Sequence, residues 1–160
     1  MHDVVVVGAG CAGMRAAIEA FDTGASVGVV SKLHPTRSHS GAAEGGINAA
    51  LGNAAEDSPE KHAFDTVKGS DYLGDQDAIE ILANEAPGDI YQLEHWGCVF
   101  SRNDEGSLAQ RPFGAAGSPR TVYSADITGH VLIHVLYEQL MKRQEQGPLE
   151  VYEEFFAWRL

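Results

Sequence analysis

The stretch "DVVVVGAGCAGMRAAIEAFDTGASVGVVSK", residues 3–32, decides the fold that we expect. Its opening run of valines closes on glycine, which predicts a buried strand of a parallel sheet. Residues 11–23 carry an apolar face with helical spacing, and Gly24 ends the predicted helix. Residues 25–32 predict a second short strand. A strand, a helix and a strand within about thirty residues form a βαβ unit, whose connection should be right-handed.

The glycines between the first strand and the helix fit the pattern G-x-G-x-x-G in the sequence Gly8-Ala9-Gly10-Cys11-Ala12-Gly13. The first glycine of this pattern permits a tight turn, the second lets the backbone approach a pyrophosphate, and the third lets helix and strand pack closely. The helix N-terminus offers N–H groups to the phosphates. The acid that binds the ribose of NAD is missing, because the second strand ends in Ser31 and Lys32. The pattern therefore indicates a dinucleotide and disfavours NAD, although the Ser31 hydroxyl can still bind a ribose.

Shorter helices are expected in the middle of the chain. The first has Asp57 as its N-cap, and Pro59 and Glu60 follow in its first turn. The second is capped by Asp75 and ended by Pro87. Residues after Pro87 add a further amphipathic turn or two.

The rest of the chain predicts a β-hairpin, a long helix and a strand. The hairpin spans residues 98–113 and turns at 103–106. The helix spans residues 126–146, and its inward side chains are Leu132, Val135, Leu136 and Leu140. A strand starts at Leu149. A doubly wound sheet needs more strands than these, so we expect an α/β architecture that is incomplete within this chain.

Composition limits the function classes. The chain has 160 residues with an apolar fraction of 44%, enough for a packed core, and a net charge of −12, which argues against nucleic acid as a partner. The only cysteines, Cys11 and Cys98, form no CxxC pair, so neither structural zinc nor a disulfide framework is expected. No apolar run approaches the roughly 20 residues of a membrane span. The acid runs at 56–57 and 153–154 are expected to be solvated.

A second stretch, "SKLHPTRSHSGAAEGGINAALGN" at residues 31–53, is too polar and too rich in glycine for a core strand. With it and with "VVGAGCAGMRAA", "DTVKGSDYLGDQDAIE", "LEHWGCVFSR", "QRPFG" and "TGHVLIHVLYEQ", the chain resembles the flavoprotein subunit of succinate dehydrogenase and fumarate reductase. The resemblance runs over nearly the whole chain, in the order of the family. It implies a Rossmann-like FAD-binding domain with a glycine-rich flavin loop, of which residues 1–160 would be the N-terminal part.

The resemblance implies that FAD is attached covalently through His39, the histidine of the family's R-S-H-T/S context. A neutral imidazole nitrogen is a competent nucleophile, able to attack the flavin 8α-methyl carbon. Arg37 would assist by its positive charge, and Gly45 and Gly46 would let backbone lie against the flavin. Without the surrounding motif, His39 would be taken for an exposed loop histidine.

The implied FAD contacts continue into a strand near residues 155–157, where backbone atoms would meet the adenine. The implied cofactor-binding residues are Gly8, Ala9, Gly10, Cys11, Ala12, Gly13, Ser31, Lys32, Arg37, Ser38, His39, Ser40, Ala43, Glu44, Gly45, Gly46, Phe156 and Ala157. Cys11 is expected to serve packing rather than redox chemistry. His130 and His134 have the i, i+4 spacing of metal ligands, but no third ligand is evident and no metal is expected.

The resemblance implies interconversion of succinate and fumarate, with electrons passed to an iron–sulfur subunit, membrane anchors and quinone. The whole subunit would lie peripherally on the cytoplasmic side of the membrane. Its dicarboxylate would be bound mainly by a capping domain, and the family also has a C-terminal helical domain; we expect neither within these residues. No catalytic acid or base is therefore assigned, and this chain alone is expected to be inactive.

Three alternatives stay open. An L-aspartate oxidase-like enzyme would hold FAD without the covalent histidine, and the sequence "TRSHS" argues against this alternative because it contains that histidine. An inactive flavin-binding fragment suits the length. An NAD-dependent dehydrogenase is disfavoured because Ser31 lies at the end of the second strand and no acid follows to bind the ribose of NAD. Arg102, Arg111 and Arg120 have no assigned role, although each is able to face an anionic dicarboxylate or a partner subunit.

Overall fold

The computed structural model describes residues 1–159, which form two compact units. The first unit joins Met1–Ala43 to the segment that starts at Gly129, and the second is Glu44–Thr128. No helix in the described part of the chain combines the length and the apolarity that crossing a membrane requires.

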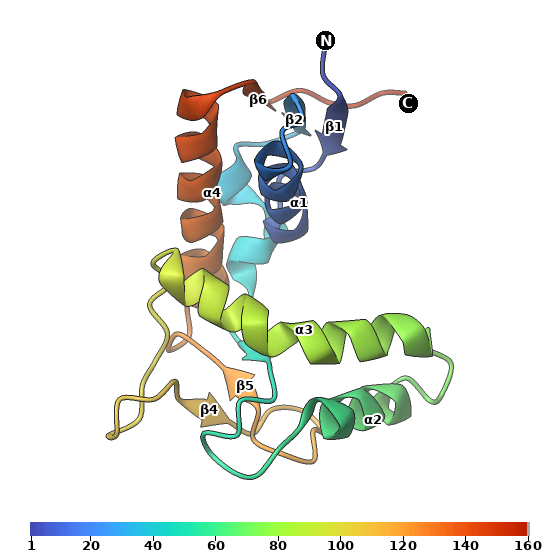
Figure 1. The fold of residues 1–160 in the computed structure, drawn as a ribbon, viewed down its shortest axis with the longest axis vertical. Helices are drawn as coiled ribbons and strands as arrows, with labels where there is room; N and C mark the ends of the chain where they lie inside the picture. Colours follow the sequence, from blue (N-terminus) through green and yellow to red (C-terminus); the bar gives the residue numbers. More distant parts are fainter. Residues whose placement is uncertain (160) are drawn as a thin grey trace. The chain divides into compact units, whose positions relative to one another are not determined.

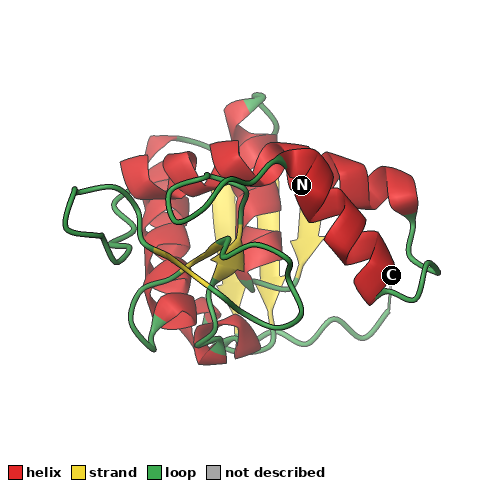
Figure 2. Cartoon of the chain, turned by 90° about the horizontal axis from the view of Figure 1, so that it is seen from below, coloured by secondary structure: helices red, strands yellow, loops and turns green. Residues whose placement is uncertain are grey.

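The first unit contains the predicted βαβ unit. Strand β1 (Val4–Val7), helix α1 (Cys11–Asp22) and strand β2 (Val27–Ser31) follow one another, and α1 packs on both strands (Figure 1). Strand β6 (Leu149–Glu153) adds to the other side of β2, so the sheet has the order β1-β2-β6. Both pairings are parallel, and Figure 2 shows these strands side by side in yellow. The predicted strands and their connecting helix are confirmed.

The core of the first unit lies between the sheet and its helices. Helix α4 (Thr128–Gln146) starts two residues later than predicted, because Ser124 N–H bonds to the Thr128 hydroxyl before the first turn. Leu132 is only half-buried, and Ile133 takes the fully buried position beside it. The fully buried side chains of this unit are Met14, Ala17, Ile18, Val27, Val29, Ile133, Leu140 and Leu149.

The expectation that the first strand is buried is wrong for the described residues. Val5 is 57% exposed and Val7 is 52% exposed. The reason is topological, because β1 is an edge strand that pairs only with β2 among residues 1–159. Consecutive side chains of a strand point to opposite faces, so a single helix covers only one of its two rows.

The second unit packs a helical hairpin near a small antiparallel sheet. Helices α2 (Pro59–Gly69) and α3 (Gln76–His95) lie side by side (Figure 1). The sheet has the order β3-β5-β4, from strands Ile47–Asn48, Thr121–Val122 and Gln110–Arg111. The predicted turn at residues 103–106 is confirmed by the Gly106 N–H to Asn103 C=O hydrogen bond, although the hairpin keeps only one bridge, Arg102 to Leu108.

Two predicted helix ends are wrong. The N-cap of α2 is Ser58, whose hydroxyl accepts a hydrogen bond from Lys61 N–H at 3.2 Å, and not Asp57. Helix α3 begins at the predicted Asp75 cap but continues through Pro87 to His95. Ala83 and Ile90 are both buried, seven residues apart on one face, so packing holds the two halves in a single helix despite the proline.

Candidate cofactor site

The glycine turn between β1 and α1 has the geometry that its sequence pattern predicts. Gly8 has a φ of +107°, which a residue with a side chain rarely adopts. A Cβ on Gly13 would lie 1.9 Å from the Gly8 carbonyl oxygen, so only glycine permits the close packing of helix on strand. The hydrogen bonds of residues 1–159 give no partner to the amides of Ala12 and Gly13. Two N–H groups at the positive end of α1 are thus available to phosphate oxygens.

A second element of the site is a turn that carries two serines to the glycine turn. It consists of the 3₁₀ helices η1 (Pro35–Arg37) and η2 (His39–Ala42). The Ser40 hydroxyl accepts a hydrogen bond from Cys11 N–H at 3.3 Å. The buried Ser38 hydroxyl has no partner in the described structure, and it lies 3.8 Å from the position of a Cβ on Gly10. An unsatisfied buried hydroxyl facing a dinucleotide-type turn fits the polar contacts of a bound FAD.

The fold of this turn follows from its local sequence. His34 is the N-cap of η1, where its Nδ1 accepts a hydrogen bond from Thr36 N–H at 3.3 Å. Pro35 is the first residue of η1, and its ring fixes the backbone φ there. The His34 ring also lies 5.0 Å from the Tyr137 ring, and its Nε2 is 3.6 Å from Glu153. His34 therefore ties the turn to α4 and β6.

His39 is the first residue of η2, and its side chain is exposed. Arg37 is also exposed and ends η1, so both side chains are free to reach a ligand. Helix α4 contacts the far side of η2 through Gly129, whose N–H donates to the Ala43 carbonyl at 2.7 Å. Sequence reasoning missed Gly129, because a glycine inside a predicted helix does not show what lies against it.

The predicted residues in the second unit lie on its small sheet. Gly46 has a φ of +116°, and a Cβ there would lie 2.4 Å from the Val122 carbonyl. Arg111 donates to the carbonyls of Glu44 at 3.1 Å and Gly45 at 2.7 Å, and its guanidinium stacks 4.2 Å from the centre of the Tyr123 ring. Contacts within the protein already require Gly46, and the approach of these glycines to the flavin stays a prediction.

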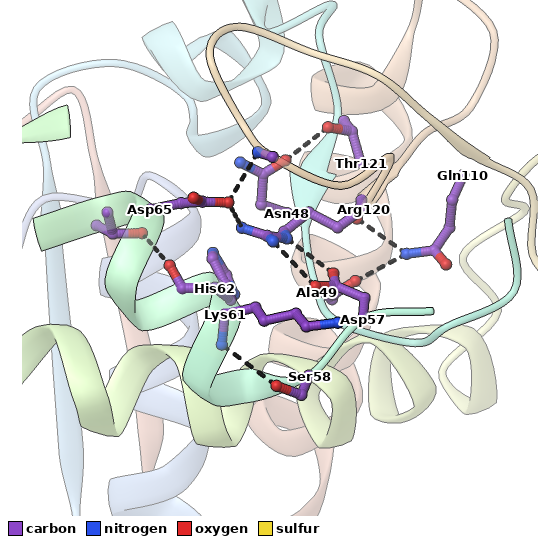
Figure 3. A network of polar contacts seen from close by, with 12 residues as sticks. Asn48, Ala49, Asp57, Ser58, Lys61, His62, Asp65, Gln110, Arg120 and Thr121 are labelled. Carbon is purple, nitrogen blue, oxygen red and sulfur yellow. Dashed lines mark hydrogen bonds and ion pairs between the residues drawn. The ribbon is translucent and has the colours of Figure 1, made fainter. Parts of the chain in front are cut away.

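Beneath this sheet lies a buried network around Arg120 (Figure 3). Arg120 bonds both carboxylate oxygens of Asp57 at 2.8 and 2.9 Å, and its Nη1 lies 2.9 Å from Asp65. The side chains of Arg120 and Asp57 are only 1% and 2% exposed, so the expectation that Asp57 is solvated is wrong. Burial alone would lower the pKa of Arg120, but the hydrogen bonds and charges of Asp57 and Asp65 raise it, and the cation is kept.

The same network fixes the chain that follows the glycines. The Gln110 amide donates to the Ala49 carbonyl at 2.8 Å and to the Arg120 carbonyl at 3.0 Å. The Thr121 hydroxyl donates to the Asn48 side chain at 2.5 Å (Figure 3). The nearby His62 is buried, and burial followed by the charge of Arg120 lowers the pKa of His62. Arg120 is therefore a structural residue of the second unit.

The C-terminal residues of the predicted site do not form a strand. Strand β6 ends at Glu153, and Glu154 leaves the strand with a φ of +61°. Phe156 and Ala157 are exposed and irregular, which corrects the expected strand near residues 155–157. The Phe155 N–H donates to the Ser31 carbonyl at 3.0 Å and holds this segment at the end of β2. Ser31 itself is buried, and Lys32 beside it is exposed.

Two cysteines and a pair of histidines are the remaining candidates for redox or metal chemistry. Burial raises the pKa of the Cys11 thiol, and it raises the pKa of Cys98 to about 12, so both stay protonated. The rings of His130 and His134 lie 4.3 Å apart on α4. Among the described residues, no group of three His, Cys, Asp or Glu side chains is placed to hold a metal ion.

A parallel βαβ unit, a glycine turn with free amides and a serine-bearing turn beside it define an α/β dinucleotide-binding protein. Residues 3–160 match the family model described as FAD binding domain, and the chain belongs to this family.

Two flavoprotein subunits are among the relatives of this chain. The chain is 50% identical over 158 residues to the succinate dehydrogenase flavoprotein subunit of Rickettsia bellii, covering 94% of this chain and 26% of that protein. It is 46% identical over 161 residues to the fumarate reductase flavoprotein subunit of Mycobacterium tuberculosis, covering 99% and 27%. The chain thus spans about a quarter of the length of these relatives.

Solved structures agree with the fold. Sdh1 of Mycobacterium smegmatis, in complex with UQ1, superposes with a TM-score of 0.93 at 36% identity, over 96% of this chain and 27% of that one. The quinol fumarate reductase of E. coli superposes with a TM-score of 0.88 at 39% identity, over 96% and 26%.

Proposed function

We propose that this chain is the FAD-binding part of a succinate dehydrogenase or fumarate reductase flavoprotein subunit, and that His39 holds the FAD covalently. The single observation that carries the proposal is the place of His39. His39 is the first residue of η2 and lies between Ser38 and Ser40, the two serines that face the glycine turn at the N-terminus of α1. A histidine nucleophile is thereby presented next to the expected pyrophosphate site. The names of the relatives support the same assignment.

Each part of the first unit has a distinct task in this proposal. The amides of Ala12 and Gly13 bind the pyrophosphate, and the unsatisfied Ser38 hydroxyl donates to the cofactor. Ser31, at the end of β2, bonds the ribose. His39 supplies an imidazole nitrogen for attachment, and Arg37 supplies positive charge beside it. When bound, FAD supplies the two-electron redox chemistry.

The remaining implied FAD contacts belong to this proposal as well. They are Lys32, Ala43, Glu44, Gly45, Gly46, Phe156 and Ala157. We assign residues 1–160 to the N-terminal part of the FAD-binding domain, with the dicarboxylate bound mainly by domains beyond them. The partners are an iron–sulfur subunit and membrane anchors, and the flavoprotein subunit itself sits peripherally on the cytoplasmic side of the membrane.

Acid precipitation of the protein expressed with FAD tests the proposal. After native desalting, the flavin absorbance is recorded, the protein is precipitated with acid, and the pellet is digested for peptide mapping. We expect flavin in the pellet on the peptide that contains His39. His39→Ala should leave flavin only in the supernatant, while His95→Ala, at an exposed position of α3, should behave as the parent.

Two results would overturn the assignment. Flavin released to the supernatant from the parent protein would show noncovalent binding and favour an aspartate oxidase-like enzyme. Protein without flavin absorbance before the acid step would refute FAD binding by this chain.

A further inference from the structure

The turn that carries His39 is held from one side by the N-terminus of helix α4. Gly129 N–H donates to the Ala43 carbonyl at 2.7 Å. A Cβ on Gly129 would lie 2.2 Å from the Ser40 carbonyl oxygen and 2.8 Å from both the nitrogen and the oxygen of Ala43. The backbones of α4 and η2 therefore touch directly at Gly129. Gly129 lies within a helix, so the missing side chain and not an unusual φ is what the site requires.

The other side of the turn is held by the glycine turn. Ser40 accepts a hydrogen bond from Cys11 N–H at 3.3 Å, and its hydroxyl is 3.2 Å from the position of a Cβ on Gly10. Contacts on both sides fix η2 relative to the N-terminus of α1. Since the pyrophosphate is expected at that N-terminus, these contacts set the distance between His39 and the rest of a bound FAD.

From this geometry we infer that Gly129 is a positioning residue for the covalent attachment of FAD to His39. The inference rests on the proposed function. Gly129 does not touch the reacting atoms; it lets α4 approach η2 closely enough to hold His39 in register with the glycine turn. Attachment rates are sensitive to such register, because a displacement of about 1 Å reduces the rate of an oriented reaction on the order of 100-fold.

Attachment forms one bond between a His39 imidazole nitrogen and the flavin 8α-carbon, and it breaks one C–H bond of the methyl group and the N–H bond of the imidazole. Two protons pass to water. The two electrons that remain, together with two protons from the water, are taken by dissolved oxygen, which becomes hydrogen peroxide.

Gly41 provides a matched control within the same turn. A Cβ on Gly41 would meet only Ile133 Cγ2 and the Thr36 carbonyl oxygen, each at 3.8 Å, which is ordinary contact. Gly41→Ala therefore adds the same methyl group to η2 without moving it. Gly129→Ala must move η2 away from α4 by about 1 Å to restore an allowed separation.

The experiment measures covalent flavin against total bound flavin in the parent, Gly129→Ala and Gly41→Ala. Each protein is incubated with FAD in air, and in-gel flavin fluorescence after denaturation gives the rate of attachment. Noncovalent FAD affinity is measured before attachment proceeds. We expect Gly129→Ala to bind FAD but to attach it roughly 100-fold more slowly, and Gly41→Ala to match the parent.

The outcomes separate the inference from the proposed function. A parent protein that never attaches FAD refutes the proposed function. A parent that attaches FAD, with Gly129→Ala equally fast, overturns the inference about Gly129. If circular dichroism shows that Gly129→Ala is unfolded, Ser40→Ala takes its place, since it removes the opposite contact without adding volume. Slower attachment in Ser40→Ala at an unchanged noncovalent FAD affinity supports a turn held from both sides, and an unchanged rate overturns it.

Discussion

At the residue scale, Arg120 and its two carboxylates show how a buried charge is tolerated. A guanidinium taken out of water is costly unless it is paired and hydrogen-bonded. Asp57 accepts two hydrogen bonds from the Arg120 guanidinium, and Asp65 lies against its remaining nitrogen. Neither acid is close to Arg120 in sequence, so the sequence patterns of helix capping and solvated acids misplaced Asp57.

Asp57→Asn should lower the free energy of unfolding by about 3 kcal/mol, because it leaves the buried Arg120 with a single carboxylate. The matched control is Glu56→Gln, next to it in sequence, whose side chain is 96% exposed. It should change the free energy by less than about 0.5 kcal/mol. Urea denaturation at pH 7 measures both, and equal effects of the two variants would contradict the buried pair.

The contribution of Asp57 should also depend on pH. Burial raises the pKa of Asp57, but the hydrogen bonds from Arg120 and the Ser58 amide outweigh it and lower the pKa below the ordinary 3.8. As the pH falls, Asp57 is therefore protonated in the unfolded chain before it is protonated in the folded protein. The stabilisation by the Asp57 carboxylate is complete above pH 3.8. It is lost as the pH falls through the pKa of Asp57 in the folded protein, so the free energies of unfolding of the parent and of Asp57→Asn should converge in that pH range.

At the element scale, α3 is the clearest case in which packing overrides a local signal. Pro87 removes a hydrogen bond to the Ala83 carbonyl and normally ends a helix. The helix nevertheless runs from Gln76 to His95, with buried residues on both sides of the proline.

Pro87→Ala should raise the free energy of unfolding by up to about 3 kcal/mol, since it restores the N–H group and removes the ring clash. The control is Glu85→Ala, at an exposed position of the same helix, which should change the free energy by less than about 0.5 kcal/mol. Thermal unfolding followed by circular dichroism compares them. A destabilised Pro87→Ala would mean that the proline is required by the packing of α3.

The elements that the sequence predicted are those long enough to carry a recognisable pattern of residues. The valine run of β1 is continuous, α1 shows helical spacing, and the glycine motif lies at their junction, with the short apolar strand β2 after the helix. Strands β3, β4 and β5 have two residues each and show no period at all. Their positions depend on side-chain contacts such as Gln110 to Ala49, which a single sequence does not display.

The candidate site was likewise predicted only in part from the sequence. The resemblance and the motif named the glycine turn and the turn at His39, and the structure brings Ser38 and Ser40 of that turn to Gly10. Gly129 was missed because its partner, the Ser40 backbone, is distant in sequence. The expected strand at Phe156 failed because β6 ends before it, at a residue with positive φ.

At the scale of the whole molecule, the excess of acid is the dominant electrostatic feature. The chain carries 23 acidic and 11 basic residues, a net charge of −12. Self-repulsion of this size opposes compaction, and salt screens it, since the Debye length falls from roughly 30 Å at 0.01 M to 10 Å at 0.1 M.

The melting temperature should therefore rise with salt between 0.01 and 0.5 M by roughly 2–4 °C, the shift that about 1 kcal/mol gives a domain of this size. Calorimetry at pH 7 measures the rise in both sodium and potassium chloride. The same titration near the isoelectric point, about pH 4.8, is the control and should show little change. A melting temperature that falls with salt at pH 7 would show that attractive ion pairs outweigh the repulsion.

The first unit is discontinuous in sequence, since the second unit is inserted between Ala43 and Gly129. This arrangement imposes an order on biosynthesis. A ribosome adds roughly 5–20 residues per second, so about 5–20 s separate the synthesis of His39 from that of Gly129. During this interval the emerging chain has its histidine but not the helix that holds the turn. On the proposed attachment at His39, the flavin would be loaded only after α4 has left the ribosome, onto a chain whose insert has already been made.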